Sequence, residues 1–156
     1  MVVRLRPLLI LAVTLVVATS VARAQAPAAV QNPAEQAAYT NAINIKDAAK
    51  RADTLEIFLA WYPNSVLRID AYEQTMAAWQ SAGSPAKADA TAAKLLQIDP
   101  DNVRALANRA YVGRTRAMSG EPDALAPAVE ASRRGVAALA KWSKPDGISD
   151  SDFSRT

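Results

Sequence analysis

The apolar residues in the middle of this chain recur at intervals of three and four positions, a pattern that predicts amphipathic helices. No segment alternates with a period of two over a β-branched run, which argues against a sheet. The expected helices cover about 33–45, 48–61, 66–82, 85–98, 103–118 and 125–142. Their recurring apolar residues are Leu55, Phe58, Leu59 and Tyr62 in the second helix, Tyr72, Met76 and Trp79 in the third, and Val129, Val136 and Leu139 in the sixth.

Helix-capping residues precede most of these helices. Residues 32–35 (Asn-Pro-Ala-Glu) are close to a capping box. The residues expected to cap later helices are Asp47, Ser65, Ser84 and Asn102. Pro122 and Pro127 both favour the first turn of a helix, and one helix cannot place both there. We therefore expect the sixth helix to start near Leu125.

These helices predict an all-α fold. One apolar face cannot bury itself alone, so each helix has to pack on another. The roughly 130 residues that follow the first 24 are enough to build such a core. A stack of helix pairs and an irregular helical bundle with the same apolar stripes both meet this requirement.

Residues 69–102 match the spacing of a known helical repeat. The matching residues are Tyr72, Trp79, Gly83, Ala88, Leu95, Asp99 and Pro100, which fall on the repeat positions without a gap. The segment resembles a tetratricopeptide repeat, in which two antiparallel helices interlock and a proline closes the pair. The resemblance implies that these residues pack the two helices together, with Gly83 in the turn.

The resemblance extends over residues 32–145, where it implies an α-solenoid of about three antiparallel helix pairs. An earlier unit closes at Pro63, 37 residues before the closing proline of the best repeat, and a later, irregular unit closes at Pro145, 45 residues after it. Two positions depart from the repeat pattern, because Thr75 and Arg109 stand where leucine is usual.

Residues 1–24 have the order of a secretory signal peptide. Two arginines precede an uncharged run over 7–22, and Ala22 and Ala24 provide the small residues for cleavage after Ala24. A permanent membrane anchor is the alternative, although the 16 uncharged residues are fewer than the roughly 20 that a spanning helix needs. An Ala/Pro/Gln linker follows over 25–31.

Several features indicate a cell-envelope protein. Residues 58–65 resemble helix ends found in bacterial cell-envelope repeat proteins. The chain contains no cysteine, so neither a lipid anchor at the cleavage site nor a disulfide can form. We expect an exported protein, periplasmic or secreted, with no stable membrane anchor after signal cleavage.

The basic character of the chain belongs to the predicted signal peptide. The full chain has a net charge of +3, but three of its 18 basic residues, Arg4, Arg6 and Arg23, precede the cleavage position. The remaining 15 basic residues balance the 15 acidic ones. A neutral chain lacks the field that attracts phosphates, so we do not expect nucleic acid as a partner.

The last residues, 146–156, resemble the start of a further helix. Asp146 and Gly147 belong to a turn, and 149–153 place acidic residues where a first helical turn would be. A stacked array normally ends with a polar capping helix, so we expect either a piece of a longer repeat array or a frayed tail.

The composition excludes most catalytic designs. Because the chain has no histidine and no cysteine, Ser-His-Asp and Cys-His schemes are impossible and the common zinc ligands are missing. Its five glycines stand apart, so no phosphate-cradling loop is present. The carboxylates at 99–101 and 146–152 follow no calcium-loop pattern. We therefore expect no enzyme, cofactor or metal, and a catalyst that uses carboxylates alone remains as a third class of function.

The resemblance also implies a ligand groove on the first helix of each pair. Carried over by position, the expected partner-binding residues are Asp70, Glu73, Gln74, Arg104, Asn108, Tyr111 and Thr115, with Ala77, Gln80, Ser81, Ala107 and Arg114 at the remaining groove positions. Such a groove would be acidic at one helix and basic at the other, which suits a peptide of mixed charge. An ordinary solvated face is the alternative.

The function expected from this fold is a non-catalytic scaffold that holds a peptide segment or a second envelope protein. The alternative is a structural subunit that associates with itself in a larger assembly. Both expectations follow from the family resemblance, because fold alone does not fix function.

Overall fold

The computed structural model describes residues 32–141, and within them it contains six α-helices, one 3-10 helix and no strand. The α-helices are α1 (Pro33–Ile43), α2 (Ala48–Trp61), α3 (Arg68–Ser81), α4 (Pro85–Ile98), α5 (Val103–Met118) and α6 (Leu125–Ala140), and the 3-10 helix is η1 (Pro122–Ala124). The all-α prediction is confirmed. The predicted signal peptide (1–24), linker (25–31) and C-terminal segment (146–156) lie outside the described residues.

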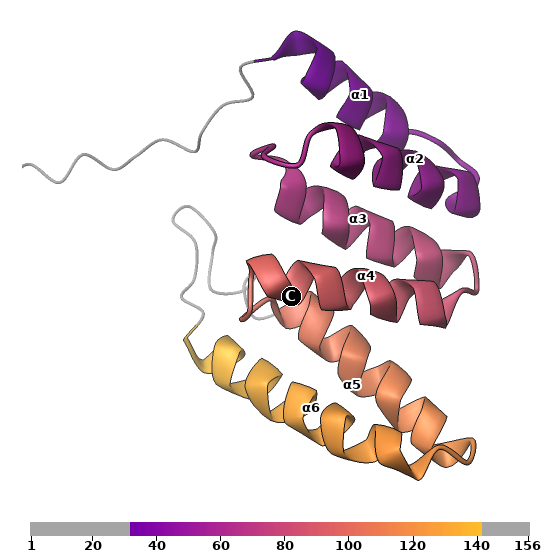
Figure 1. Ribbon diagram of the computed structural model, residues 1–156, viewed down its shortest axis with the longest axis vertical. Coiled ribbons are helices and arrows are strands. Elements are labelled where there is room, and N and C mark those ends of the chain that lie inside the picture. Colours follow the sequence, from indigo (N-terminus) through magenta and orange to yellow (C-terminus); the bar gives the residue numbers. More distant parts are fainter. Residues whose placement is uncertain (1–31, 142–156) are drawn as a thin grey trace, which may run out of the picture.

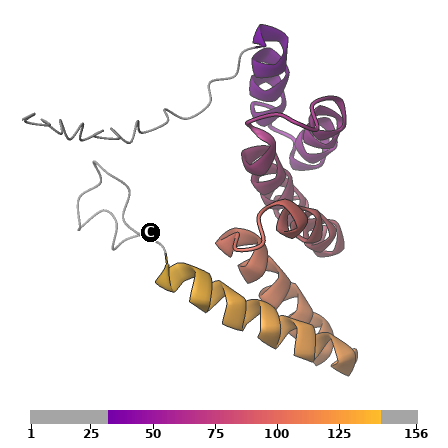
Figure 2. The same cartoon turned by 60° about the vertical axis from the view of Figure 1, so that its left-hand side comes forward.

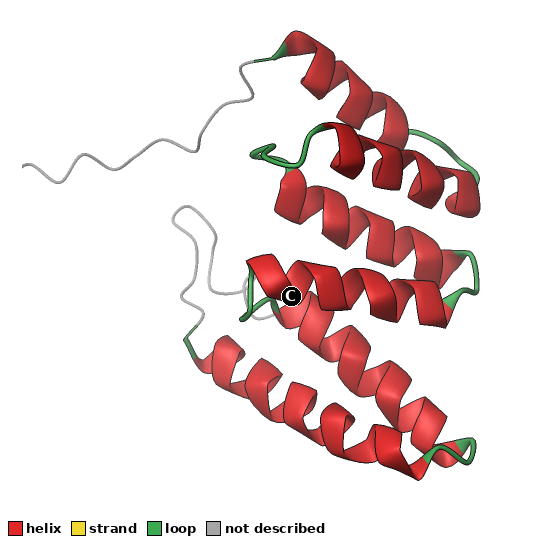
Figure 3. Cartoon of the chain, in the orientation of Figure 1, coloured by secondary structure: helices red, strands yellow, loops and turns green. Residues whose placement is uncertain are grey.

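The helices stack in chain order, and each runs antiparallel to the one before it (Figure 1). The main contacts are between consecutive helices, which short loops connect (Figure 3). Seen from the side, α2 and α4 lie on one side of the column that α1, α3 and α5 make (Figure 2). No helix of residues 32–141 combines the length and hydropathy that crossing a membrane requires.

Three of the predicted caps form. The Oδ1 atom of Asn32 accepts the backbone N–H of Ala34 (3.0 Å), and the side chains of Asp47 and Asn102 cap α2 and α5 in the same way. These side chains satisfy N–H groups that a helix start leaves without partners. The bounds of α2, α4 and α5 accordingly match the prediction.

The predicted Ser65 and Ser84 caps do not form. The hydroxyl of Ser65 instead donates to Glu35 of α1 and accepts the N–H of Leu67, so α3 starts later, at Arg68. Ser84 occupies the N-cap position of α4 without a side-chain hydrogen bond, and Pro85 provides the preset first turn.

The two prolines before α6 are accommodated in separate helices. Pro122 opens η1, whereas Pro127 lies in the first turn of α6, where its missing N–H has no helical partner to lose. The observed start of α6 at Leu125 therefore agrees with the prediction.

The core consists of three clusters along the stack. Tyr39, Ala42, Leu55, Phe58 and Ala71 join α1 to α2 and α3; Ala52, Met76, Ala78, Trp79, Ala88, Ala92, Leu95 and Ala105 join α2 through α5; and Leu106, Ala131 and Ala138 join α5 to α6. Thr75, which replaces the usual leucine, is fully buried and donates its hydroxyl to the carbonyl of Ala71 at 2.7 Å. A polar group is thus buried there without an unmade hydrogen bond.

Trp79 lies where α2, α3 and α4 meet. Its side chain is 2% exposed, and its Nε1 donates to Oε1 of Glu56 in α2 at 2.9 Å. From α4, the Nζ atom of Lys87 lies 3.8 Å from the ring centroid, a cation–π contact. One side chain of α3 therefore holds both neighbouring helices.

The crossing of α5 and α6 depends on a glycine. A Cβ atom at Gly113 would lie 2.8 Å from the Cβ of Ala128 and 3.1 Å from the carbonyl oxygen of Ala124. At Gly135, on α6, the nearest atom to such a Cβ would be the Cβ of Leu106 at 3.6 Å, an ordinary contact. Only the first position requires the absence of a side chain.

Replacing Trp79 by alanine should lower the free energy of unfolding by about 3–5 kcal/mol, because it removes an aromatic ring from a closed contact of three helices. Trp61→Ala provides the matched control, since the Trp61 side chain is 73% exposed, and should change stability by less than about 0.5 kcal/mol. Urea melts of both variants measure the difference. Equal losses would show that the Trp79 contact contributes nothing beyond an exposed ring.

The two mid-helix glycines should respond to alanine with opposite signs. Gly113→Ala should destabilise the protein by about 1–3 kcal/mol, because the new methyl group overpacks the α5–α6 crossing. Gly135→Ala should stabilise it by about 0.5–1 kcal/mol, because alanine favours the helix and the contact has room. Thermal melts followed by circular dichroism test both, and a stabilising Gly113→Ala would disprove the close approach.

Candidate functional site

A cavity of about 350 Å³ lies between the faces of α3 and α5. The residues that line it are Glu73, Met76, Ala77 and Gln80 from α3, and Arg104, Ala107, Asn108 and Tyr111 from α5. On each helix they follow spacings of three and four, which place side chains on one face. All of them except Met76 are among the twelve groove positions expected from the sequence.

Glu73 is the centre of the charged part of this cavity. Its Oε2 accepts from Nη1 of Arg104 at 3.0 Å, and its Oε1 accepts from Nδ2 of Asn102 at 2.8 Å. The Glu73 side chain is largely covered, whereas 70% of the Arg104 side chain is exposed. The acid is therefore already paired, and the guanidinium, which has five N–H donors, presents most of its surface to solvent.

Asn108 forms a polar floor beside this pair. The residue is 3% exposed, and its Oδ1 accepts from Nε2 of Gln80 at 2.8 Å. The Nδ2 of Asn108 is buried without a hydrogen-bond partner among the described residues. The expectation that Asn108 contributes little to folding is therefore wrong, because an alanine there would leave the Gln80 amide without its acceptor.

Tyr111 forms the exposed wall of the cavity. The residue is 61% exposed, although it lies on the same helix face as buried Asn108. An aromatic ring held on a helix with its face in water provides a large apolar contact area that loses little conformational freedom on binding.

The other expected partner-binding residues do not line this cavity. The carboxylate of Asp70 accepts the hydroxyl of Tyr39 in α1, and burial together with this hydrogen bond raises the pKa of the Tyr39 phenol above its usual range. Thr115 donates its hydroxyl to the carbonyl of Tyr111 on its own helix (3.0 Å). Gln74 is half-buried in α3 outside the lining. The expected set therefore divides into an assembled group and these three residues.

A second cavity, of about 640 Å³, adjoins the first through two shared residues, Glu73 and Arg104. It extends past the α4–α5 turn to the end of α6, where Leu139 and Lys141 complete its lining. The Nζ atom of Lys141 donates to Oδ2 of Asp101 at 3.2 Å across this end. The α6 residues were missed from the sequence, because the irregular length of the third unit hides which residues of α6 reach the face of α5.

The residues expected to pack the best repeat lie where α3 meets α4. Trp79, Ala88 and Leu95 belong to one buried cluster, and Tyr72 is partly buried against it. Gly83 adopts φ +67° in the turn between the helices, a conformation that suits glycine. Pro100 is exposed after α4, and its carbonyl accepts from Nη2 of Arg134 at 2.5 Å.

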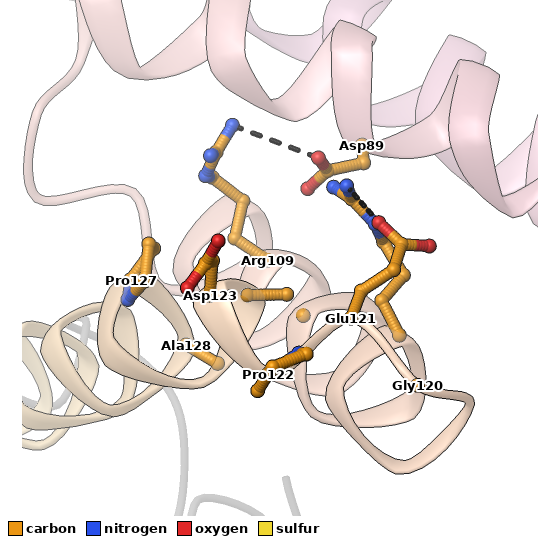
Figure 4. Close-up of a pocket in the computed structure, with 11 residues that line it drawn as sticks. Asp89, Arg109, Gly120, Glu121, Pro122, Asp123, Pro127 and Ala128 are labelled. Carbon is orange, nitrogen blue, oxygen red and sulfur yellow. Dashed lines mark hydrogen bonds and ion pairs between the residues drawn. The ribbon is translucent and has the colours of Figure 1, made fainter.

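A third cavity, of about 520 Å³, lies on the opposite side of α5, against α4 and the α5–α6 connection (Figure 4). Its charges pair with one another. Nη1 of Arg109 lies 3.8 Å from Oδ2 of Asp89, and Nη2 of Arg116 donates to Oε2 of Glu121 at 2.5 Å. The hydrogen bond and charge of Arg116 hold the pKa of Glu121 below its usual range. We regard this cavity as a structural junction that connects α4 to the last helix pair.

The site offers binding groups rather than an arrangement of catalytic ones. Across residues 32–141, no group of three or more acidic, histidine or cysteine side chains is placed to hold a metal ion. Comparison of the chain with protein-family models, curated proteins and solved structures finds no match. The interpretation of this site therefore depends on its own residues.

Proposed function

We propose that the protein is a non-catalytic adaptor of the bacterial cell envelope, built as a tetratricopeptide-type solenoid of three helix pairs, that holds a peptide segment of a partner protein. The pairs are α1 with α2, α3 with α4, and α5 with α6. The sequence spacing over 69–102 and the antiparallel, chain-order stacking of the helices support the repeat assignment. No cofactor takes part.

The observation that carries this proposal is the continuous concave surface of α3 and α5. Two cavities share Glu73 and Arg104, and together they extend from exposed Tyr111 to Leu139 at the end of α6. Between the two helices, the methyl groups of Ala77 and Ala107 leave room for a main chain. A groove with small residues along its length and polar groups at its margins suits a peptide rather than a compact ligand.

The charges of this surface define the peptide that it fits. Arg104 is the exposed cation, and it can donate to a carboxylate or a main-chain carbonyl of the ligand. Glu73 and Asp70 are already paired with Arg104, Asn102 and Tyr39, so their remaining capacity to hold a basic residue is small. The preferred peptide therefore carries an acidic group next to an apolar side chain that contacts Tyr111.

The proposed location follows from the order of residues 1–24 and the absence of cysteine. Export with cleavage after Ala24 would place the helices in the periplasm or outside the cell. A partner in that compartment would have to present an extended segment, as many envelope proteins do at their termini and loops.

Expression of the full chain in a bacterium should yield an exported product that begins at Gln25. Intact mass measurement on the periplasmic fraction tests this directly, because cleavage removes the same 24 residues from every molecule. A product in the membrane fraction that retains Met1 would contradict export in this form.

Photo-crosslinking tests the groove. A benzoylphenylalanine in place of Tyr111 should capture a partner from the envelope fraction, whereas the same group in place of exposed Trp61 should not. Arg104→Ala in the Tyr111-labelled protein should reduce the captured amount at least about tenfold, equivalent to about 1.4 kcal/mol. The melting temperature should hardly change, because the Arg104 side chain is exposed.

Two results would oppose the adaptor proposal. Equal capture at positions 111 and 61 would show contact without a groove. Unchanged capture in Arg104→Ala would remove the electrostatic part of the proposed recognition. Asn108 is unsuitable as a test position, since its substitution changes the fold as well as the surface.

A further inference from the structure

The outer flank of α6 carries a stripe of exposed apolar residues. Leu125, Val129, Val136 and Leu139 are 51%, 60%, 66% and 47% exposed, and Ser132 lies between them on the same side of the helix. Meanwhile α6 buries only Ala128, Ala131, Gly135 and Ala138. The helix thus turns its small residues inward and its large apolar residues outward, the reverse of the usual surface helix.

The stripe is open space in the structure. A cavity of about 560 Å³ along its first half is lined by Pro122, Leu125, Ala126, Val129, Glu130 and Arg133. The main contacts of α6 are with α5 and η1, so the stripe lies at the end of the stack (Figure 2). A contiguous apolar surface of this kind is a usual mark of an interaction site.

The order of side chains identifies what the stripe fits. Leu, Val, Ser, Val and Leu at 125, 129, 132, 136 and 139 form the same series when read in either direction. When two copies of α6 pack antiparallel, Leu125 of each lies beside Leu139 of the other, Val129 beside Val136, and the two Ser132 residues meet at the twofold axis. The small serine permits close approach at the centre, and a surface that matches itself is what a twofold dimer needs.

The charges beside the stripe match themselves in the same way. Arg133 donates to Glu130 on its own helix at 2.5 Å, and both side chains border the stripe. In the antiparallel pair, Arg133 of one copy lies close to Glu130 of the other. Opposite charges then alternate around the axis, whereas a parallel pair would bring like charges together.

We propose that the protein forms a twofold dimer through antiparallel contact of α6 with α6 of a second copy. The contact area of one helix face is below the roughly 1,200–2,000 Å² of standard interfaces. Association should therefore be weak, with a dissociation constant on the order of 10–100 µM. This inference is independent of the groove, since none of the stripe residues except Leu139 borders it.

Sedimentation equilibrium of the full chain over a wide concentration range tests the dimer. Val129→Lys and Val136→Glu should each weaken it at least about tenfold, because each places an unpaired charge in an apolar contact. An equimolar mixture of the two variants should restore association, since antiparallel packing brings position 129 of one variant beside position 136 of the other. Val66→Lys, at a similarly exposed valine far from α6, is the matched control and should dimerise normally.

The outcomes separate this contact from its rivals. Restoration in the mixture supports the antiparallel pair, and dimerisation by both single variants overturns it. A monomeric wild type, together with a lower melting temperature in Val129→Lys, would show instead that residues 142–156 cover the stripe, which also overturns the proposal. Arg104→Ala should leave the dimer intact, so a failure of the groove and a failure of the dimer are distinguishable.

Discussion

Each helix of this protein is too short and too weakly amphipathic to be stable without a neighbour, and Trp79 is where three of them are held together. Its ring occupies the contact of α2, α3 and α4, and its N–H is satisfied by Glu56. Because the ring fixes how α3 is turned, it also decides which residues of α3 face the groove. Glu73, Ala77 and Gln80 line that cavity as a consequence of the core contact.

Asn102 couples folding to the groove in a second way. Its Oδ1 caps α5 through the N–H of Ala105, while its Nδ2 donates to Glu73 and to Asp99. The start of α5 and the orientation of the central carboxylate are therefore set by one buried amide. A polar surface built on such contacts is preorganised, so binding would require little rearrangement of the groups that are already paired.

Local sequence signals were sufficient for most helix bounds. Asn32, Asp47 and Asn102 cap the helices that follow them, and the two prolines near 125 correctly limited the start of α6. The Ser65 cap failed because its hydroxyl found a distant partner in α1, which no local pattern reveals.

The site was less predictable, because position on a helix face does not give depth. Asn108 and Tyr111 are three residues apart on one face, yet one is buried and the other exposed, since Gln80 of α3 covers only the first. In α6, the valines and leucines looked like a core stripe in the sequence. The structure instead buries the alanines and Gly135, because the close α5–α6 crossing at Gly113 has no room for larger side chains.

Alanine has a further consequence through the amount of surface that it hides. Ten of the eighteen buried apolar residues within 32–141 are alanines. Each exposes far less apolar surface on unfolding than a leucine does, and it is this exposure that raises the heat capacity of the unfolded chain. The heat-capacity change per residue should therefore lie below the usual value of about 12–15 cal/mol/K. The curve of stability against temperature is correspondingly flat, and the stack keeps nearly the same stability in cold and warm surroundings.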